Sequence, residues 1–146
     1  MGNIIKVLIV DDEVEILKTI EQYLSFFEGI ELMTASSFES AQRIINDKEP
    51  NVVITDVNLG DGNGLELIQI SQKYTKANQV IVITGVSDTT RVVDALELGA
   101  VDYIKKPLDM NILKQRLDEA CSRYGRWHKI FTDELQKPRL EFCPSI

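Results

Sequence analysis

The hydrophobic residues of the chain gather in five short runs rich in valine and isoleucine, a composition typical of buried β-strands. The runs are IIKVLIV (4–10), IELMTA (30–35), NVVITD (51–56), QVIVIT (79–84) and AVDYIK (100–105). After each run, apolar residues recur at helical spacing, so the pattern predicts strand and helix alternating five times. This order predicts a parallel sheet with right-handed crossovers.

The runs VLIV and VIVI are apolar on both alternating faces, as expected for strands covered by helices on both sides. The predicted fold is therefore a doubly wound, five-stranded parallel α/β sandwich, for which 2-1-3-4-5 is a common strand order. Residues that typically begin or end helices lie at the ends of the expected helices. The expected N-caps are Ser37, Asp88 and Asp109, and the expected helix stops are Gly29, Gly99 and Gly125.

The length of 146 residues suits one domain, which we assign to residues 1–125. No sixth strand–helix unit follows, and Pro138 and Pro144 disfavour regular structure, so residues 126–146 are predicted to be a C-terminal extension, partly helical or disordered. No apolar run reaches the roughly 18 residues needed to cross a membrane, and the N-terminus lacks a signal-peptide pattern. These features predict a cytoplasmic protein without membrane contact.

The net charge and the few histidines and cysteines argue against two functions, nucleic-acid binding and zinc binding. The formal net charge of −7 at pH 7 argues against direct nucleic-acid binding by this domain, because phosphate contacts need a basic face. The single histidine, His128, and the two cysteines, Cys121 and Cys143, form no zinc-type motif.

Polar residues follow the expected strands at the edge of the sheet where ligands bind in doubly wound folds. Asp11 and Asp12 follow the first strand, Asp56 ends the third, Thr84 ends the fourth, and Lys106 follows the fifth. Any one of them alone would be explained as a cap of the next helix. Three carboxylates together repel one another unless a cation joins them, and oxygen ligands without histidine favour Mg²⁺. With a hydroxyl and an ammonium group opposite, the set predicts a phosphoryl-transfer site with Asp56 as the nucleophile.

Four motifs resemble the receiver domain of two-component response regulators: VDDE (10–13), TDVNLGDGNG (55–64), ITG (83–85) and DYIKKPLD (102–109). The resemblance extends over about residues 4–124. It implies a flavodoxin-like sheet in the order 2-1-3-4-5, and a signalling switch rather than a conventional enzyme.

The resemblance implies that Asp56 accepts a phosphoryl group from a phosphohistidine of a histidine kinase or a histidine phosphotransfer protein. Thr84 and Lys106 would bind the phosphoryl oxygens. The implied ligands of Mg²⁺, with Mn²⁺ as the alternative ion, are Asp11, Asp12, Asp56 and the backbone carbonyl of Asn58.

The family's lysine directly precedes a proline, which selects Lys106 over Lys105 and implies a cis Lys106–Pro107 bond. Thr84 and Tyr103 are the implied switch residues. Their movement would alter a surface formed by residues 88–98 and 101–117, to which an output partner protein, a downstream domain or a second copy of the chain would bind.

Two positions depart from the family pattern. Gly60 occupies a position that usually carries proline, and with Gly62 and Gly64 it predicts a mobile loop. Val86, two residues after Thr84, is apolar, from which we predict slow to intermediate hydrolysis of the phosphoaspartate.

Two other readings stay open at this point. A haloacid-dehalogenase-type phosphohydrolase uses similar groups in a doubly wound fold, but its nucleophile follows the first strand rather than the third. A phosphorylation-independent receiver-like binding module would share the fold, and the intact set of Asp56, Thr84 and Lys106 argues against it. A flavodoxin-like electron carrier is disfavoured because DDEVEI (11–16) would repel the flavin phosphate.

Overall fold

The computed structural model of the chain describes residues 4–85 and 89–136. Its centre is a five-stranded parallel sheet in the order β2-β1-β3-β6-β7, which confirms the predicted fold. The strands lie close to the five hydrophobic runs. They are β1 (Ile5–Val10), β2 (Ile30–Ala35), β3 (Val52–Asp56), β6 (Gln79–Thr84) and β7 (Asp102–Lys105).

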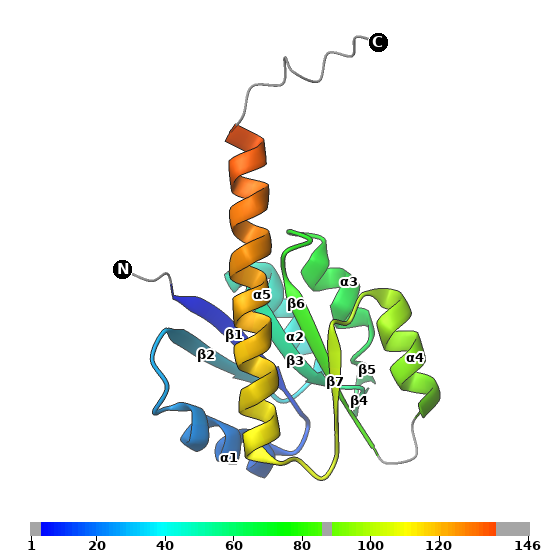
Figure 1. Cartoon of the computed structure of the whole chain (residues 1–146). Coiled ribbons are helices and arrows are strands. Elements are labelled where there is room, and N and C mark those ends of the chain that lie inside the picture. Colours follow the sequence, from blue (N-terminus) through cyan, green and yellow to red (C-terminus); the bar gives the residue numbers. More distant parts are fainter. Residues whose placement is uncertain (1–3, 86–88, 137–146) are drawn as a thin grey trace.

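Helices cover both faces of the sheet, as the doubly apolar strands predict (Figure 1). One face packs against α1 (Val14–Leu24) and α5 (Met110–Gln136), and the other against α2 (Phe38–Lys48), α3 (Glu66–Gln72) and α4 (Thr89–Leu98). Neighbouring residues of one strand enter different core layers. Leu8 and Val10 pack on the α2 side, whereas Val7 and Ile9 pack on the α1 side.

Several predicted helix ends are confirmed. Ser37 forms a capping box with Ser40 at the start of α2, and the Asp109 carboxylate accepts hydrogen bonds from the first turn of α5. Gly99 follows α4 directly with φ +113°, a conformation that favours glycine. The expected cap at Asp88 lies outside the described residues.

Two predicted helix stops are wrong. The helix α1 ends at Leu24 with Ser25 as its C-cap, five residues before Gly29, which instead precedes β2. The helix α5 does not end at Gly125 but continues to Gln136, so that its last turns extend beyond the strands (Figure 1). The side chain of Tyr124 joins this part of α5 to the sheet, because its hydroxyl accepts a 3.0 Å hydrogen bond from Asn51, which directly precedes β3.

The segment after Asp56 contains two short strands that the hydrophobic pattern does not predict. They are β4 (Asn58–Leu59) and β5 (Gly62–Asn63), which pair antiparallel as a small hairpin. Among the described residues, no helix combines the length and the apolar character required to cross a membrane.

Candidate functional site

The polar residues predicted to form a site lie together at the carboxyl edge of the sheet. Asp11 directly follows β1, Asp56 ends β3 and Thr84 ends β6, and all three side chains are buried. Lys106 follows β7, and its backbone N–H donates a 2.8 Å hydrogen bond to the carbonyl of Thr84. The Lys106–Pro107 peptide bond is cis, as expected.

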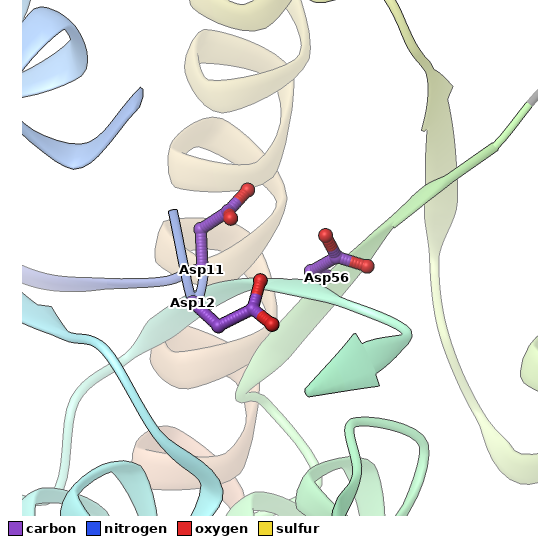
Figure 2. A group of neighbouring side chains, drawn as sticks. All are labelled: Asp11, Asp12 and Asp56. Carbon is purple, nitrogen blue, oxygen red and sulfur yellow. The ribbon is translucent and has the colours of Figure 1, made fainter. Parts of the chain in front are cut away.

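Three carboxylates form a cluster at this edge. One oxygen from each of Asp11, Asp12 and Asp56 lies within 4.8 Å of the other two. Figure 2 shows Asp11 and Asp12 beside the end of the first strand, with the Asp56 carboxylate across from them. Asp12 is exposed whereas the other two are buried, so the cluster opens to solvent on the Asp12 side.

The Asp56 carboxylate has a partner on each oxygen. Lys106 Nζ lies 2.6 Å from Oδ2, and the backbone N–H of Asn58 donates to Oδ1 at 2.9 Å. Asp56 retains only 6% exposure. These contacts fix the orientation of the carboxylate at the mouth of the cluster.

Lys106 is the positive centre of the site. Its Nζ also lies 3.7 Å from Asp11 Oδ2 and 3.7 Å from Glu13 Oε1. Burial by itself would lower the pKa of Lys106, but the hydrogen bond to Asp56 and the attraction of the surrounding carboxylates raise it. Glu13 is a site residue that the sequence reasoning missed, although it is the last letter of the VDDE motif.

The burial of Asp11 in the cluster costs folding free energy. Its Oδ1 accepts a hydrogen bond from the Glu13 N–H, but its buried Oδ2 has no hydrogen-bond partner within the described residues. Burial raises the pKa of Asp11 despite the lowering by that hydrogen bond and by Lys106. Since an unpaired buried carboxylate oxygen costs free energy, this donor set fits a hard divalent cation.

Helix capping does not explain these carboxylates. The N-cap residue of α1 is Glu13, and its side chain makes no capping hydrogen bond. Asp56 is followed by β4 rather than by a helix. Neither Asp11 nor Asp56 is therefore the N-cap residue of a helix.

Thr84 offers a free polar group beside the carboxylates. The residue is 1% exposed, and its Oγ1 has no hydrogen-bond partner in the part of the chain that the structure describes. Buried hydroxyl groups are normally paired, so an unpaired one at a sheet edge is suited to an incoming oxygen ligand.

The loop after Asp56 contains the β4–β5 hairpin, which is closed by a 2.8 Å hydrogen bond from the Gly64 N–H to the Val57 carbonyl. The mobility expected from its three glycines stays a prediction. Gly64 is required because a Cβ atom there would lie 2.0 Å from the carbonyl oxygen of Asp56. Asn58 is exposed on β4 and adjoins Asp56 through its backbone N–H.

Two further contacts hold this hairpin, and the sequence reasoning missed both. The Asp61 carboxylate accepts hydrogen bonds from the N–H groups of Phe38 and Glu39 at the start of α2. Arg91 of α4 donates to the side-chain oxygens of Asn58 and Asn63, at 3.4 Å each. No local sequence signal links positions so far apart in the chain.

The remaining predicted residues lie on the α4–β7–α5 side of the site. Tyr103 is 38% exposed on β7, so its ring stands at the surface. Lys105 is exposed, whereas the neighbouring Lys106 turns to Asp56. Val86 lies outside the described residues, and the predicted rate of hydrolysis stays a prediction.

Comparison with known proteins finds one family whose model matches most of the chain. Residues 7–118 match the family described as response regulator receiver domain. The transcriptional regulatory protein MalR of Bacillus subtilis is 34% identical over 143 residues, which cover 97% of this chain and 59% of that protein. KdpE of Mycobacterium tuberculosis, also named a transcriptional regulatory protein, is 33% identical over 135 residues, which cover 92% of this chain and 57% of KdpE. The chain spans little more than half the length of these two relatives.

Solved structures of receiver domains also match most of the chain. A receiver domain protein from Clostridium thermocellum matches with a TM-score of 0.77 at 31% identity, covering 85% of this chain and 99% of that one. A CheY-like receiver domain protein from Methanospirillum hungatei matches with a TM-score of 0.78 at 29% identity, covering 85% and 98%.

Proposed function

Because the chain belongs to the family of response regulator receiver domains, we propose that Asp56 is the residue that accepts the phosphoryl group. Members of this family are signalling switches rather than conventional enzymes, and a histidine kinase is the implied donor. The observation that carries the assignment is the 2.6 Å contact between Lys106 Nζ and Asp56 Oδ2 beside the carboxylate cluster.

The chemistry required of the chain is positioning and charge compensation. A carboxylate oxygen of Asp56 attacks the phosphorus of a phosphohistidine, the bond from phosphorus to the histidine nitrogen breaks, and the histidine leaves. Lys106 then compensates the charge of the phosphoryl oxygens, and the Thr84 hydroxyl, which has no partner in the described part of the chain, donates to one of them. Both groups lie at the same sheet edge as Asp56, which supports these roles.

We assign the cation site to Asp11, Asp12, Asp56 and the backbone carbonyl of Asn58. Two observations support this assignment: Asp11 Oδ2 has no hydrogen-bond partner among the described residues, and the three carboxylates lie close together. When bound, Mg²⁺, or Mn²⁺ in its place, would supply neutralisation of negative charge on the carboxylates and on the transferred group.

The proposed switch uses the surface around α4, β7 and α5. A phosphoryl group brings nearly two negative charges and three acceptor oxygens to Asp56. The hydroxyl of Thr84 would turn to one of these oxygens, and the exposed ring of Tyr103 would move into the space that Thr84 leaves. The altered surface would then bind an output partner protein or a downstream domain, or pair with a second copy.

The donor protein needs a route to a nearly buried carboxylate. A groove beside Lys106 runs between α1 and the segment after β7. Its lining residues include Ile16, Thr19, Pro107 and Leu108. We propose that the phosphohistidine-bearing protein docks here, whether it is a histidine kinase or a histidine phosphotransfer protein.

The output of the signal is proposed from the relatives. Both curated relatives are named transcriptional regulatory proteins and are longer than this chain. We propose that phosphorylation likewise reaches an output partner or domain, with no direct nucleic-acid contact by the acidic receiver domain. The cytoplasmic location, and the boundary between residues 1–125 and 126–146, stay predictions.

The test is to incubate the protein with Mg²⁺ and acetyl phosphate and to measure the intact mass. We expect the wild type to gain the mass of one phosphoryl group and Asp56→Asn to gain none. A gain in both proteins, or in neither, would remove Asp56 from the proposed role. Mg²⁺ titration of the same two proteins separates a failure of cation binding from a failure of transfer.

A further inference from the structure

The β4–β5 hairpin carries one of the proposed cation ligands, yet its sequence does not favour a fixed position. The segment from 60 to 64 holds three glycines, and each glycine makes the backbone costly to order. The hairpin must nevertheless hold the backbone of Asn58 next to Asp56. Some contact outside the hairpin therefore has to offset this cost.

Asp61, at the turn of the hairpin, makes such a contact. Its Oδ1 and Oδ2 accept hydrogen bonds from the N–H groups of Phe38 (2.7 Å) and Glu39 (3.1 Å) at the start of α2. These bonds are charge-assisted and lie at the positive end of the helix dipole. The two N–H groups hold the pKa of Asp61 below its ordinary value, so the carboxylate is ionised at neutral pH.

The start of α2 does not depend on Asp61 for its N-cap. Ser37 Oγ accepts from the Ser40 N–H at 3.1 Å, and the Ser40 hydroxyl contacts the Ser37 N–H, which completes a capping box. Asp61 is a second acceptor at this helix start, and it lies 22 to 23 residues along the chain from the two N–H groups. It therefore joins two elements that are separate in sequence. The contact links the hairpin to a helix start that already has its own N-cap.

The turn of the hairpin lies between the start of α2 and the carboxylate cluster. A Cβ atom at Gly62 would lie 2.8 Å from Phe38 Cγ, so the hairpin backbone lies directly against the Phe38 ring. A Cβ atom at Gly60 would lie 3.8 Å from Asp12 Oδ2, so the same turn borders the exposed carboxylate of the cluster. A shift of the turn would change the surroundings of Asp12 and the position of Asn58 together.

We propose that Asp61 is a positioning residue for the cation site: it clamps the β4–β5 hairpin to the N-terminus of α2 and thereby holds the Asn58 backbone beside Asp56 and the turn beside Asp12. This inference rests on the proposed function of the carboxylate cluster. It also explains how a loop with Gly60 in place of proline keeps a defined shape. Asp61 itself touches neither the cation nor the phosphoryl group.

The test compares Asp61→Ala with Ser37→Ala, because both remove a hydrogen-bond acceptor from the start of α2 but only the first releases the hairpin. Three quantities are measured in each protein. They are the midpoint of thermal unfolding, the dissociation constant of Mg²⁺ by calorimetric titration, and amide hydrogen exchange of residues 57–64 without Mg²⁺.

We expect Asp61→Ala to weaken Mg²⁺ binding about tenfold, the lower end of the losses seen when residues that orient metal ligands are removed. Hydrogen exchange of the hairpin amides should accelerate by a similar factor. Asp61→Asn keeps one acceptor oxygen and should lie between Asp61→Ala and the wild type. Ser37→Ala should lower the unfolding midpoint but leave Mg²⁺ binding and hairpin exchange unchanged.

The inference is overturned if Asp61→Ala binds Mg²⁺ as the wild type does, or if Ser37→Ala weakens binding equally, because the effect would then be one of general stability. A wild type that binds no Mg²⁺ would instead contradict the proposed function of the cluster. In that case the exchange of the hairpin amides in Mg²⁺-free protein still decides whether the clamp exists.

Discussion

The two edges of the central sheet both contain polar side chains, but most of those at the amino edge are paired, with Asn78 Oδ1 as an exception among the described residues. At the amino edge, Asn51 accepts from the Lys6 N–H and donates to the Tyr124 hydroxyl, while Gln79 donates to the Ala77 carbonyl. At the carboxyl edge, the buried Asp11 and Thr84 each keep an atom without a hydrogen-bond partner among the described residues. The bonds of Asn51 and Gln79 stabilise the fold, whereas the atoms of Asp11 and Thr84 that have no partner in the described part of the chain are available for a ligand at some cost in stability.

The largest expected effect is on the carboxyl edge. Lys106→Ala should slow phosphorylation by acetyl phosphate about 100-fold, the loss typical when one group that stabilises transferred charge is removed. Lys105→Ala is the matched control, since Lys105 is exposed and neighbours Lys106 in the chain. Intact-mass time courses measure both rates. Equal losses in the two variants would contradict the assignment of Lys106.

A polar residue of the amino edge should affect stability and not chemistry. Asn51→Ala leaves the Lys6 N–H and the Tyr124 hydroxyl without their partner, which should lower the free energy of unfolding by about 2 kcal/mol. Urea unfolding measures this loss. The phosphorylation rate of the folded variant should equal that of the wild type, and a slower rate would mean that the two edges are coupled.

Asp11→Asn should raise the free energy of unfolding, whereas Asn51→Ala should lower it. Asp11→Asn removes a buried carboxylate whose pKa is raised by burial, so the Mg²⁺-free variant should be more stable than the wild type at neutral pH, while Mg²⁺ binding is lost. Asp12→Asn is the control, because Asp12 is exposed and its charge costs little.

The stability of Asp11→Asn relative to the wild type should increase as the pH rises. Below the pKa of an unfolded aspartate, about 3.9, Asp11 is protonated in both states and the two proteins should be equally stable. As the pH rises through the raised pKa of folded Asp11, the wild type loses stability relative to Asp11→Asn, and the gap is complete above it. Unfolding measured across this range without Mg²⁺ checks the sign; a gap that closes at higher pH would contradict it.

The smallest effect is expected for Tyr124→Phe. This change removes the acceptor of the 3.0 Å hydrogen bond from Asn51 and a 3.4 Å contact with His128 Nδ1, and Tyr124 is half-buried, so water can replace part of these interactions. The free energy of unfolding should fall by about 0.5 to 1 kcal/mol. A loss as large as that of Asn51→Ala would contradict the expected order of the two effects.

Much of the fold could be predicted because the strands are strongly apolar and evenly spaced. Two of the five runs, 30–35 and 79–84, coincide with β2 and β6, and the others differ by two residues at most. The carboxyl-edge residues were predictable for the same reason, since strand ends in a parallel sheet meet at one edge. The hydrophobic pattern alone does not show whether Lys105 or Lys106 contacts Asp56. The resemblance to the family, whose lysine directly precedes a proline, selected Lys106.

The features that the sequence reasoning missed depend on contacts between distant segments. The clamp between Asp61 and α2 joins a glycine-rich turn to a helix start, and a local pattern contains no signal for it. Gly125 was expected to end α5, because glycine costs about 1 kcal/mol relative to alanine inside a helix. The helix continues because Tyr124 is bonded to the sheet before this point, and Trp127 stacks on Phe131 after it.

The most direct test of the central claim is to locate the phosphoryl group itself. The protein is phosphorylated with acetyl phosphate and Mg²⁺, the acyl phosphate is reduced with borohydride, and the modified residue is identified by peptide mass spectrometry. We predict a single modified position, Asp56, which is lost when Mg²⁺ is removed. Modification at Asp11 or Asp12 instead, or a mass gain that does not require Mg²⁺, would contradict the account.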